Sequence, residues 1–111
     1  MTIDPDVGTV AKQWGLPATL LQAVVQAEGD LVRAVQCSIP SVTTRAEALE
    51  VLARSCTHRM AEFLVVDRRA AAFVTFFGSK WAPVGVANDP RGLNLNWAKN
   101  VLALWAPDRV K

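Results

Sequence analysis

The segment from Pro17 to Val32 restricts the possible folds of this chain more than any other part of it. Apolar residues recur there at steps of three and four, which is the spacing of one face of a helix. They form two adjacent rows, Leu20, Val24, Ala27 and Leu31 beside Leu21, Val25 and Val32. A helix that is apolar over so wide an arc has to be covered by other elements on most of its sides. We therefore predict a central helix over about Pro17–Glu28.

The rest of the chain also shows helical spacing. Four further helices are predicted, over Asp6–Trp14, from Thr44 to about Leu64, over Arg68–Phe77 and over about Asn94–Trp105. Thr44 and Glu47 have the three-residue spacing of a capping box. Val65–Val66 is too short to form a strand pair. The sequence therefore predicts an all-α fold of about five helices with little or no β-structure.

The composition is typical of a folded globular chain. Apolar residues make up 51% of the 111 residues and charged residues 20%, a balance that argues against disorder. The length suits one hydrophobic core, so we expect a single domain over residues 1–111. The net charge of +2 is too small to indicate a nucleic-acid partner by itself.

The cysteines and the histidine indicate neither a metal site nor a cofactor. Cys37, Cys56 and His58 are too few for a four-ligand zinc site. Buried structural cysteines explain Cys37 and Cys56 best, and a disulfide between them stays open. A cysteine-dependent amidase or peptidase is a weaker alternative. Cys56 and His58 point apart on a helix, and Pro40 leaves no helix start after Cys37 that would activate its thiol.

Glu28 is the residue that departs from the apolar pattern. It follows Val25 by three residues and Leu21 by seven, so a helix carries it on the apolar face, and Gly29 is a natural helix end. Partial burial and the negative end of the helix dipole both favour a protonated carboxyl. A carboxylic acid that keeps its proton near neutral pH is what protonation of a glycosidic oxygen requires. The structural alternative is a glutamate at the edge of the apolar face whose carboxylate reaches water.

Two segments resemble a known superfamily. The segment WGLPATLLQAVVQAEGD, Trp14–Asp30, resembles the first catalytic motif of the lytic transglycosylase and goose-type lysozyme-like superfamily. In that motif a glycine–hydrophobic–proline entry leads into an apolar helix that ends in the catalytic glutamate, and the usual E-S-G is E-G here. The segment KWAPVGVANDPRGLNLNWAKNV, Lys80–Val101, is similar to the closing segment of small muramidase-like proteins from phages. Together the two segments cover about a third of the chain.

The resemblance implies a lysozyme-like fold and a muramidase that cleaves bacterial peptidoglycan without a metal or cofactor, with Glu28 as the catalytic residue. Lytic transglycosylases use one glutamate as acid and then as base, and a hydroxyl of the sugar itself closes an anhydro ring. A hydrolase usually needs a second carboxylate. Asp30 lies too near Glu28 along the chain to oppose it across a sugar. The other candidates are Glu62, Asp67 and Asp89.

Substrate binding is expected from residues near the C-terminal segment. Trp81, predicted in a loop beside Pro83, offers an indole face to a sugar ring or else fills the core under the loop. Asn88 and Asn94 can bind N-acetyl groups, and Asp89 can face a cleft. Alternatively, Asp89 caps the turn before the following proline and Asn94 caps the last helix. The other tryptophans lie on apolar helical faces and are predicted in the core: Trp14, Trp97 and Trp105.

The chain departs from the superfamily pattern at three points. Gly29 replaces the serine after the glutamate, Ala34–Val42 does not match the usual G-L-M-Q stretch, and the A-Y-N motif is absent because the chain has no tyrosine. An inactive lysozyme-like binding or structural module of a phage particle is therefore one alternative. A helix-turn-helix over Val10–Val24 is another, but its second helix is apolar where contacts to bases and phosphates would lie. No nucleic-acid partner is expected.

The partners and the location follow from the resemblance only in outline. The expected partner is bacterial peptidoglycan, joined by phage structural proteins if the domain belongs to a virion. No apolar run approaches the ~20 residues of a membrane span. Met1–Asp6 lacks the basic-then-apolar order of a secretory signal. We therefore expect either a virion-associated protein or a cytoplasmic one that another factor delivers to the cell wall.

Overall fold

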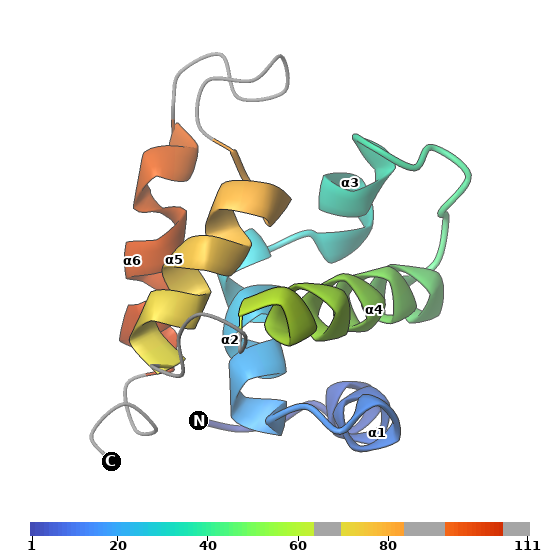
Figure 1. Ribbon diagram of the computed structural model, residues 1–111. Coiled ribbons are helices and arrows are strands. Elements are labelled where there is room, and N and C mark those ends of the chain that lie inside the picture. Colours follow the sequence, from blue (N-terminus) through green and yellow to red (C-terminus); the bar gives the residue numbers. More distant parts are fainter. Residues whose placement is uncertain (64–69, 84–92, 106–111) are drawn as a thin grey trace.

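The computed structural model describes residues 1–63, 70–83 and 93–105, and the secondary-structure elements of these residues are all helices, with no strand among them. The all-α fold class predicted from the sequence is confirmed. Along the chain the elements are α1 (Pro5–Trp14), α2 (Ala18–Glu28), α3 (Leu31–Gln36), α4 (Arg45–Phe63), α5 (Ala70–Trp81), the 3₁₀-helix η1 (Leu93–Asn96) and α6 (Trp97–Leu104) (Figure 1).

Helix α2 is the centre of the fold, as its two apolar rows predict. Every residue from Leu20 to Val25 is buried, and α2 packs against α1, α3 and α6. Figure 1 shows α2 between α1 and α4 on one side and α5 and α6 on the other. Because its residues from Leu20 to Val25 are buried, they cannot contact a DNA groove, which argues against the helix-turn-helix alternative.

Glycines end the first two helices. Gly15 follows α1 with φ 69° and Gly29 follows α2 with φ 74°, in the left-handed region that favours glycine. After Gly29 the chain turns into α3, a separate helix that the sequence analysis did not anticipate. Its start is capped by Asp30, whose carboxylate accepts the backbone N–H of Arg33 at 3.1 Å. Leu31 is buried, as its place in the apolar row predicts, but it belongs to α3.

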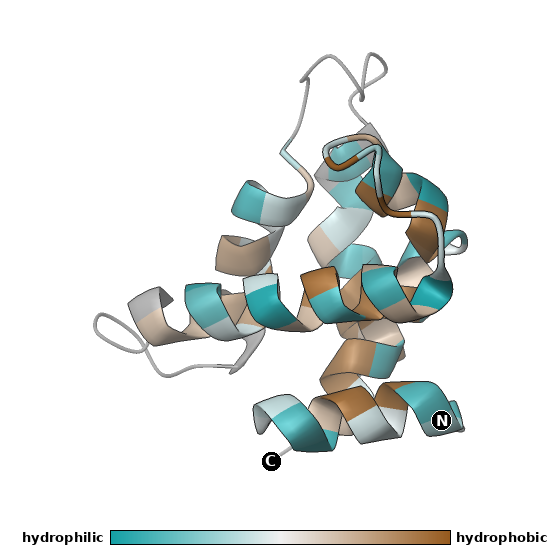
Figure 2. Cartoon of the chain, turned by 90° about the vertical axis from the view of Figure 1, so that its right-hand side faces the viewer, coloured by the Kyte–Doolittle hydropathy of each residue, from teal (hydrophilic) through white to brown (hydrophobic). Residues whose placement is uncertain are grey.

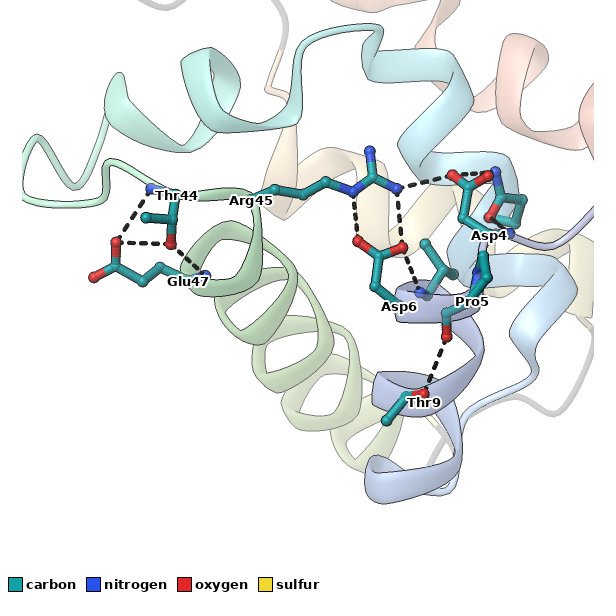
Figure 3. A network of polar contacts seen from close by, with 9 residues as sticks. Asp4, Pro5, Asp6, Thr9, Thr44, Arg45 and Glu47 are labelled. Atoms are coloured by element: carbon teal, nitrogen blue, oxygen red, sulfur yellow. Dashed lines mark hydrogen bonds and ion pairs between the residues drawn. The ribbon is translucent and has the colours of Figure 1, made fainter.

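A polar network fixes the start of α4 to the start of the chain (Figure 3). The Arg45 guanidinium donates to Asp6 at 2.6 Å and to Asp4 at 2.8 Å. Its hydrogen bond holds the pKa of Asp6 below the ordinary value. The buried Gln22 of α2 also donates to Asp4, at 3.2 Å. The network therefore joins the N-terminal segment, α2 and α4.

The predicted capping box is present at the start of α4. The backbone N–H of Glu47 donates to Oγ1 of Thr44, and the backbone N–H of Thr44 donates to Oε1 of Glu47, both at 3.2 Å. Thr44 therefore caps the helix and α4 begins one residue later, at Arg45. Figure 2 shows hydrophilic and hydrophobic residues in alternating bands along this helix, as expected for an element with one covered face.

Helices α5 and α6 lie side by side and are joined by aromatic rings (Figure 1). The ring of Phe77 stacks on Phe73 with centroids 5.7 Å apart and meets Trp97 edge-on at 5.8 Å. The sequence predicted that the helix corresponding to α5 ends at Phe77. This prediction was wrong, because α5 continues through Gly78 to Trp81.

The last predicted helix is divided in two, since its first turn is the 3₁₀-helix η1 and α6 begins only at Trp97. The helices that the structure describes include none that is both long and apolar enough to cross a membrane.

Candidate functional site

Glu28 lies at a meeting point of three helix ends. It is the last residue of α2, Trp81 is the last residue of α5, and Trp97 is the first residue of α6. Both indole N–H groups donate to the same oxygen of Glu28, Oε1, at 3.0 Å from Trp81 and at 2.8 Å from Trp97. The glutamate side chain is partly buried. The structure therefore keeps the carboxyl on the apolar face, where the sequence pattern places it.

The two oxygens of this carboxyl differ in their surroundings. An indole N–H can only donate, so Oε1 is an acceptor whether the carboxyl is protonated or ionised. Oε2 has no hydrogen-bond partner among the residues that the structure describes. It is not a fully buried atom, so solvent reaches it. A proton on this carboxyl therefore belongs on Oε2, the oxygen that reaches solvent.

A pocket of about 350 Å³ opens beside Glu28. This volume lies near the lower end of the range for ligand sites in proteins, ~300–1,000 Å³. The side chains come from the ends of α2 and α5, from α3 and the turn after it, from α4 and from η1. They are Glu28, Ala34, Val35, Cys37, Ser38, Ile39, Val51, Ser55, Lys80, Trp81, Ala82 and Asn94. Figure 1 shows α3 facing the C-terminal end of α5, and α3, α4 and α5 each contribute two residues to the lining of the pocket.

The charges in the pocket are few. Glu28 is the one carboxylate among its described lining residues. Lys80 supplies a cation, with Nζ 6.0 Å from the centroid of the Phe76 ring, and it forms no ion pair with a described residue. Trp81, Ile39 and Val51 add apolar surface. The arrangement is a single acid in a mixed polar and apolar pocket, which suits proton transfer to a bound neutral or anionic molecule.

Trp81 and Asn94 lie in the pocket with Glu28, as the sequence analysis expects of substrate-binding residues. The loop predicted at Trp81 was wrong, because this residue closes α5. Asn94 lies in η1, where its amide donates to the carbonyl of Pro83 at 3.1 Å. It does not cap the last helix, since α6 begins after Asn96. The substrate-binding roles themselves stay predictions.

Most of the remaining acidic candidates fall outside what the structure describes. Asn88, Asp89 and Asp67 lie outside the described residues, and so does the side chain of Glu62. Asp30 is described, and its carboxylate caps α3 instead of facing Glu28 across the pocket. Among the described residues, no second carboxylate therefore lies opposite Glu28 in the pocket.

Trp97 is the site residue that sequence reasoning assigned only to the core. It is buried, with 7% of its surface exposed, as predicted, yet its N–H reaches Glu28 from 69 positions away along the chain. A buried tryptophan needs an acceptor for its N–H, and that need was the available signal. Trp105 is also buried and donates to Oγ1 of Thr19, whereas Trp14 is only partly buried and donates to Glu50.

The cysteines are free and have different environments. Cys56 is buried, and burial raises the pKa of its thiol to about 12, which removes it as a nucleophile at neutral pH. The expectation that both cysteines are buried was wrong for Cys37, which is exposed in the turn after α3 and lines the pocket. His58 is exposed on α4 and does not line the pocket. Nowhere in the described ranges do three metal-binding side chains come together.

No protein-family model, curated protein or solved structure matches this chain.

Proposed function

We propose that this protein cleaves bacterial peptidoglycan at the bond between N-acetylmuramic acid and N-acetylglucosamine, with Glu28 as general acid and base. The observation that carries the proposal is the carboxyl of Glu28 in an open pocket, with one oxygen held by two donors and the other without a partner among the described residues. General acid catalysis requires a proton donor that can reach the leaving oxygen. The resemblance of Trp14–Asp30 to the transglycosylase motif supplies the substrate class.

The proposed reaction uses Oε2 of Glu28 twice. Its proton passes to the glycosidic oxygen while the bond from that oxygen to the anomeric carbon breaks, and the N-acetylglucosamine side leaves as an alcohol. The carboxylate then accepts the proton of a hydroxyl of the muramic acid residue while that oxygen bonds to the anomeric carbon. The product is an anhydro sugar, and Glu28 regains its proton.

The resemblance of Trp14–Asp30 to the transglycosylase motif favours this route over hydrolysis. Hydrolases that retain or invert configuration use two carboxyl groups, one of which acts as nucleophile or activates water. Among the described pocket residues, Glu28 has no such partner. Lys80, which also lines the pocket, supplies a positive charge suited to the carboxylates of the peptides that peptidoglycan carries.

The test compares Glu28 with Glu50, because both carboxylates accept an indole N–H. Glu28→Gln keeps the shape of the side chain but removes the proton donor, so the loss of turbidity of purified sacculi should slow by about 10²–10⁴-fold. Glu50→Gln is the matched control, because Glu50 also accepts an indole N–H, from Trp14 at 2.9 Å, and does not line the pocket. Equal clearing of sacculi by wild type and Glu28→Gln would reject the catalytic role of Glu28.

The second candidate is an inactive lysozyme-like module of a phage particle. Gly29 in place of the usual serine and the missing G-L-M-Q and A-Y-N segments favour it. Such a module would sediment with sacculi and leave their glycan chains at full length. Shortened chains with the wild type exclude this candidate.

A further inference from the structure

We infer that Trp81 and Trp97 are positioning residues of this site: they hold one oxygen of Glu28 as an acceptor and leave proton transfer to the other, while Gly78 sets the place of the Trp97 ring. For the proton transfer the inference rests on the proposed function. For the orientation of the carboxyl it rests on the hydrogen bonds alone.

The first step is the convergence of two donors on one atom. A glutamate side chain has several rotatable bonds and would otherwise sample many orientations. Two N–H groups at 3.0 and 2.8 Å, from different helices, restrict Oε1 to one place. Neither indole changes its protonation in the range where a carboxyl titrates. The orientation of Glu28 is therefore the same before and after it gives up its proton.

Both indole rings pack against the same buried side chain, that of Phe77. Phe77, itself 1% exposed, lies 5.7 Å from the ring of Trp81 and 5.8 Å from that of Trp97, measured between centroids. Because one buried ring contacts both indoles, their positions relative to each other are fixed by the core. The donors are thus placed in advance of any substrate.

The third step concerns Gly78, in the interior of α5. Glycine is a poor helix former compared with alanine, so its presence there needs a reason. A Cβ at this position would lie 2.7 Å from Cε3 of Trp97, closer than real contacts allow. The missing side chain lets the indole lie against the helix, where its N–H reaches Glu28. At Gly8 in α1, by contrast, a Cβ would meet Ile3 at an ordinary 3.7 Å.

The orientation of the Glu28 carboxyl can be tested independently of catalytic activity, by the NMR signals of the indole N–H groups in ¹⁵N-labelled protein. Glu28→Gln should shift the signals of Trp81 and Trp97 and leave those of Trp14 and Trp105, which donate to Glu50 and Thr19. If neither signal responds to Glu28→Gln, the inference is wrong.

The effect on catalysis is tested with variants that keep the core filled. Trp97→Phe removes the N–H but keeps an aromatic ring, and Trp105→Phe is the control at the far end of α6. We expect kcat on sacculi to fall by about 10- to 100-fold with Trp97→Phe, because a misplaced acid transfers its proton poorly, while KM stays close to wild type.

Gly78→Ala should lower kcat in the same way, and Gly8→Ala should leave it unchanged. Wild-type kcat and KM in folded Trp97→Phe would overturn the positioning role, whether or not Gly78→Ala folds. If the two indole signals respond but Glu28→Gln is fully active, the proposed function fails and the orientation of the carboxyl stands.

Discussion

Two glutamates of this chain accept an indole N–H, and the differences between them explain why only one is assigned a reaction. Glu50 receives one donor, Trp14, and does not line the pocket. Glu28 receives two donors on one oxygen and does line it. A hydrogen bond to a carboxylate is thus a common structural device, whereas an oriented carboxyl with one accessible oxygen in a pocket is suited to catalysis.

The sequence indicated Glu28, and Trp81 and Asn94 beside it, but not the hydrogen bonds that hold the carboxyl. The helical period alone places a carboxylate on the apolar face, because Leu21 and Val25 precede it by two turns and one. The bond from Trp97 depends on how α2, α5 and α6 pack, and no local pattern contains that information. The sequence therefore indicated the acid and left out the hydrogen bonds that orient it.

Thiol reactivity should differ sharply between the two cysteines. We expect Cys37, which is exposed, to react with a thiol reagent in the native protein, and Cys56 to react only after unfolding, because burial raises its pKa to about 12. Mass spectrometry after alkylation measures both sites, and Cys37→Ser should abolish native labelling. Rapid native labelling of Cys56 would contradict the burial described here.

At the level of elements, Gly15 and Gly29 end helices, whereas Gly78 lies inside one. The predicted helix ends before Gly15 and Gly29 were correct, and the positive φ angles of these two residues favour glycine. The sequence analysis also ended a helix near Gly78, wrongly, since the reason for that glycine is the ring of Trp97 from another helix. A glycine in the sequence marks a helix end only where its own backbone conformation is the reason that the position is a glycine.

The link between α4 and the N-terminal segment should depend on pH. The hydrogen bond from Arg45 lowers the pKa of Asp6 below its ordinary 3.8. A carboxylate with a lowered pKa contributes stability that is fully present above the unfolded value and is lost as the pH falls through the folded one. Arg45→Ala should therefore destabilise the protein at neutral pH by up to about 1 kcal/mol, the range of exposed ion pairs.

Urea unfolding of wild type and Arg45→Ala at neutral pH and below pH 3.8 measures this difference, which should shrink in acid. Arg54→Ala is the control, because Arg54 is exposed on the same helix and forms no ion pair with a described residue. A difference between wild type and Arg45→Ala that is constant with pH would exclude this role for Asp6.

At the scale of the whole molecule, the covered helix α2 decides both the fold and the site. The wide apolar arc required other elements around it, and the helical spacing of the rest of the chain made the all-α class predictable before any contact was known. The same covering brings α5 and α6 to its C-terminal end, where Glu28 lies. The site is therefore a consequence of how the core is built.

The core should respond to truncation according to burial. Leu49 in α4 is fully buried, so Leu49→Ala should lower the free energy of unfolding by about 2–5 kcal/mol. Leu104 is 36% exposed, and Leu104→Ala should cost much less. Denaturation followed by circular dichroism and by tryptophan fluorescence measures both variants. Similar losses for the two leucines would contradict the assignment of the core.

The most direct measurement is the mass of the fragments released from purified cell-wall glycan. Wild-type protein should produce new chain ends one water lighter than hydrolysed ends, and Glu28→Gln should produce almost none. Glycan that stays uncut by the wild type, or that both proteins cut equally, would contradict the proposed function.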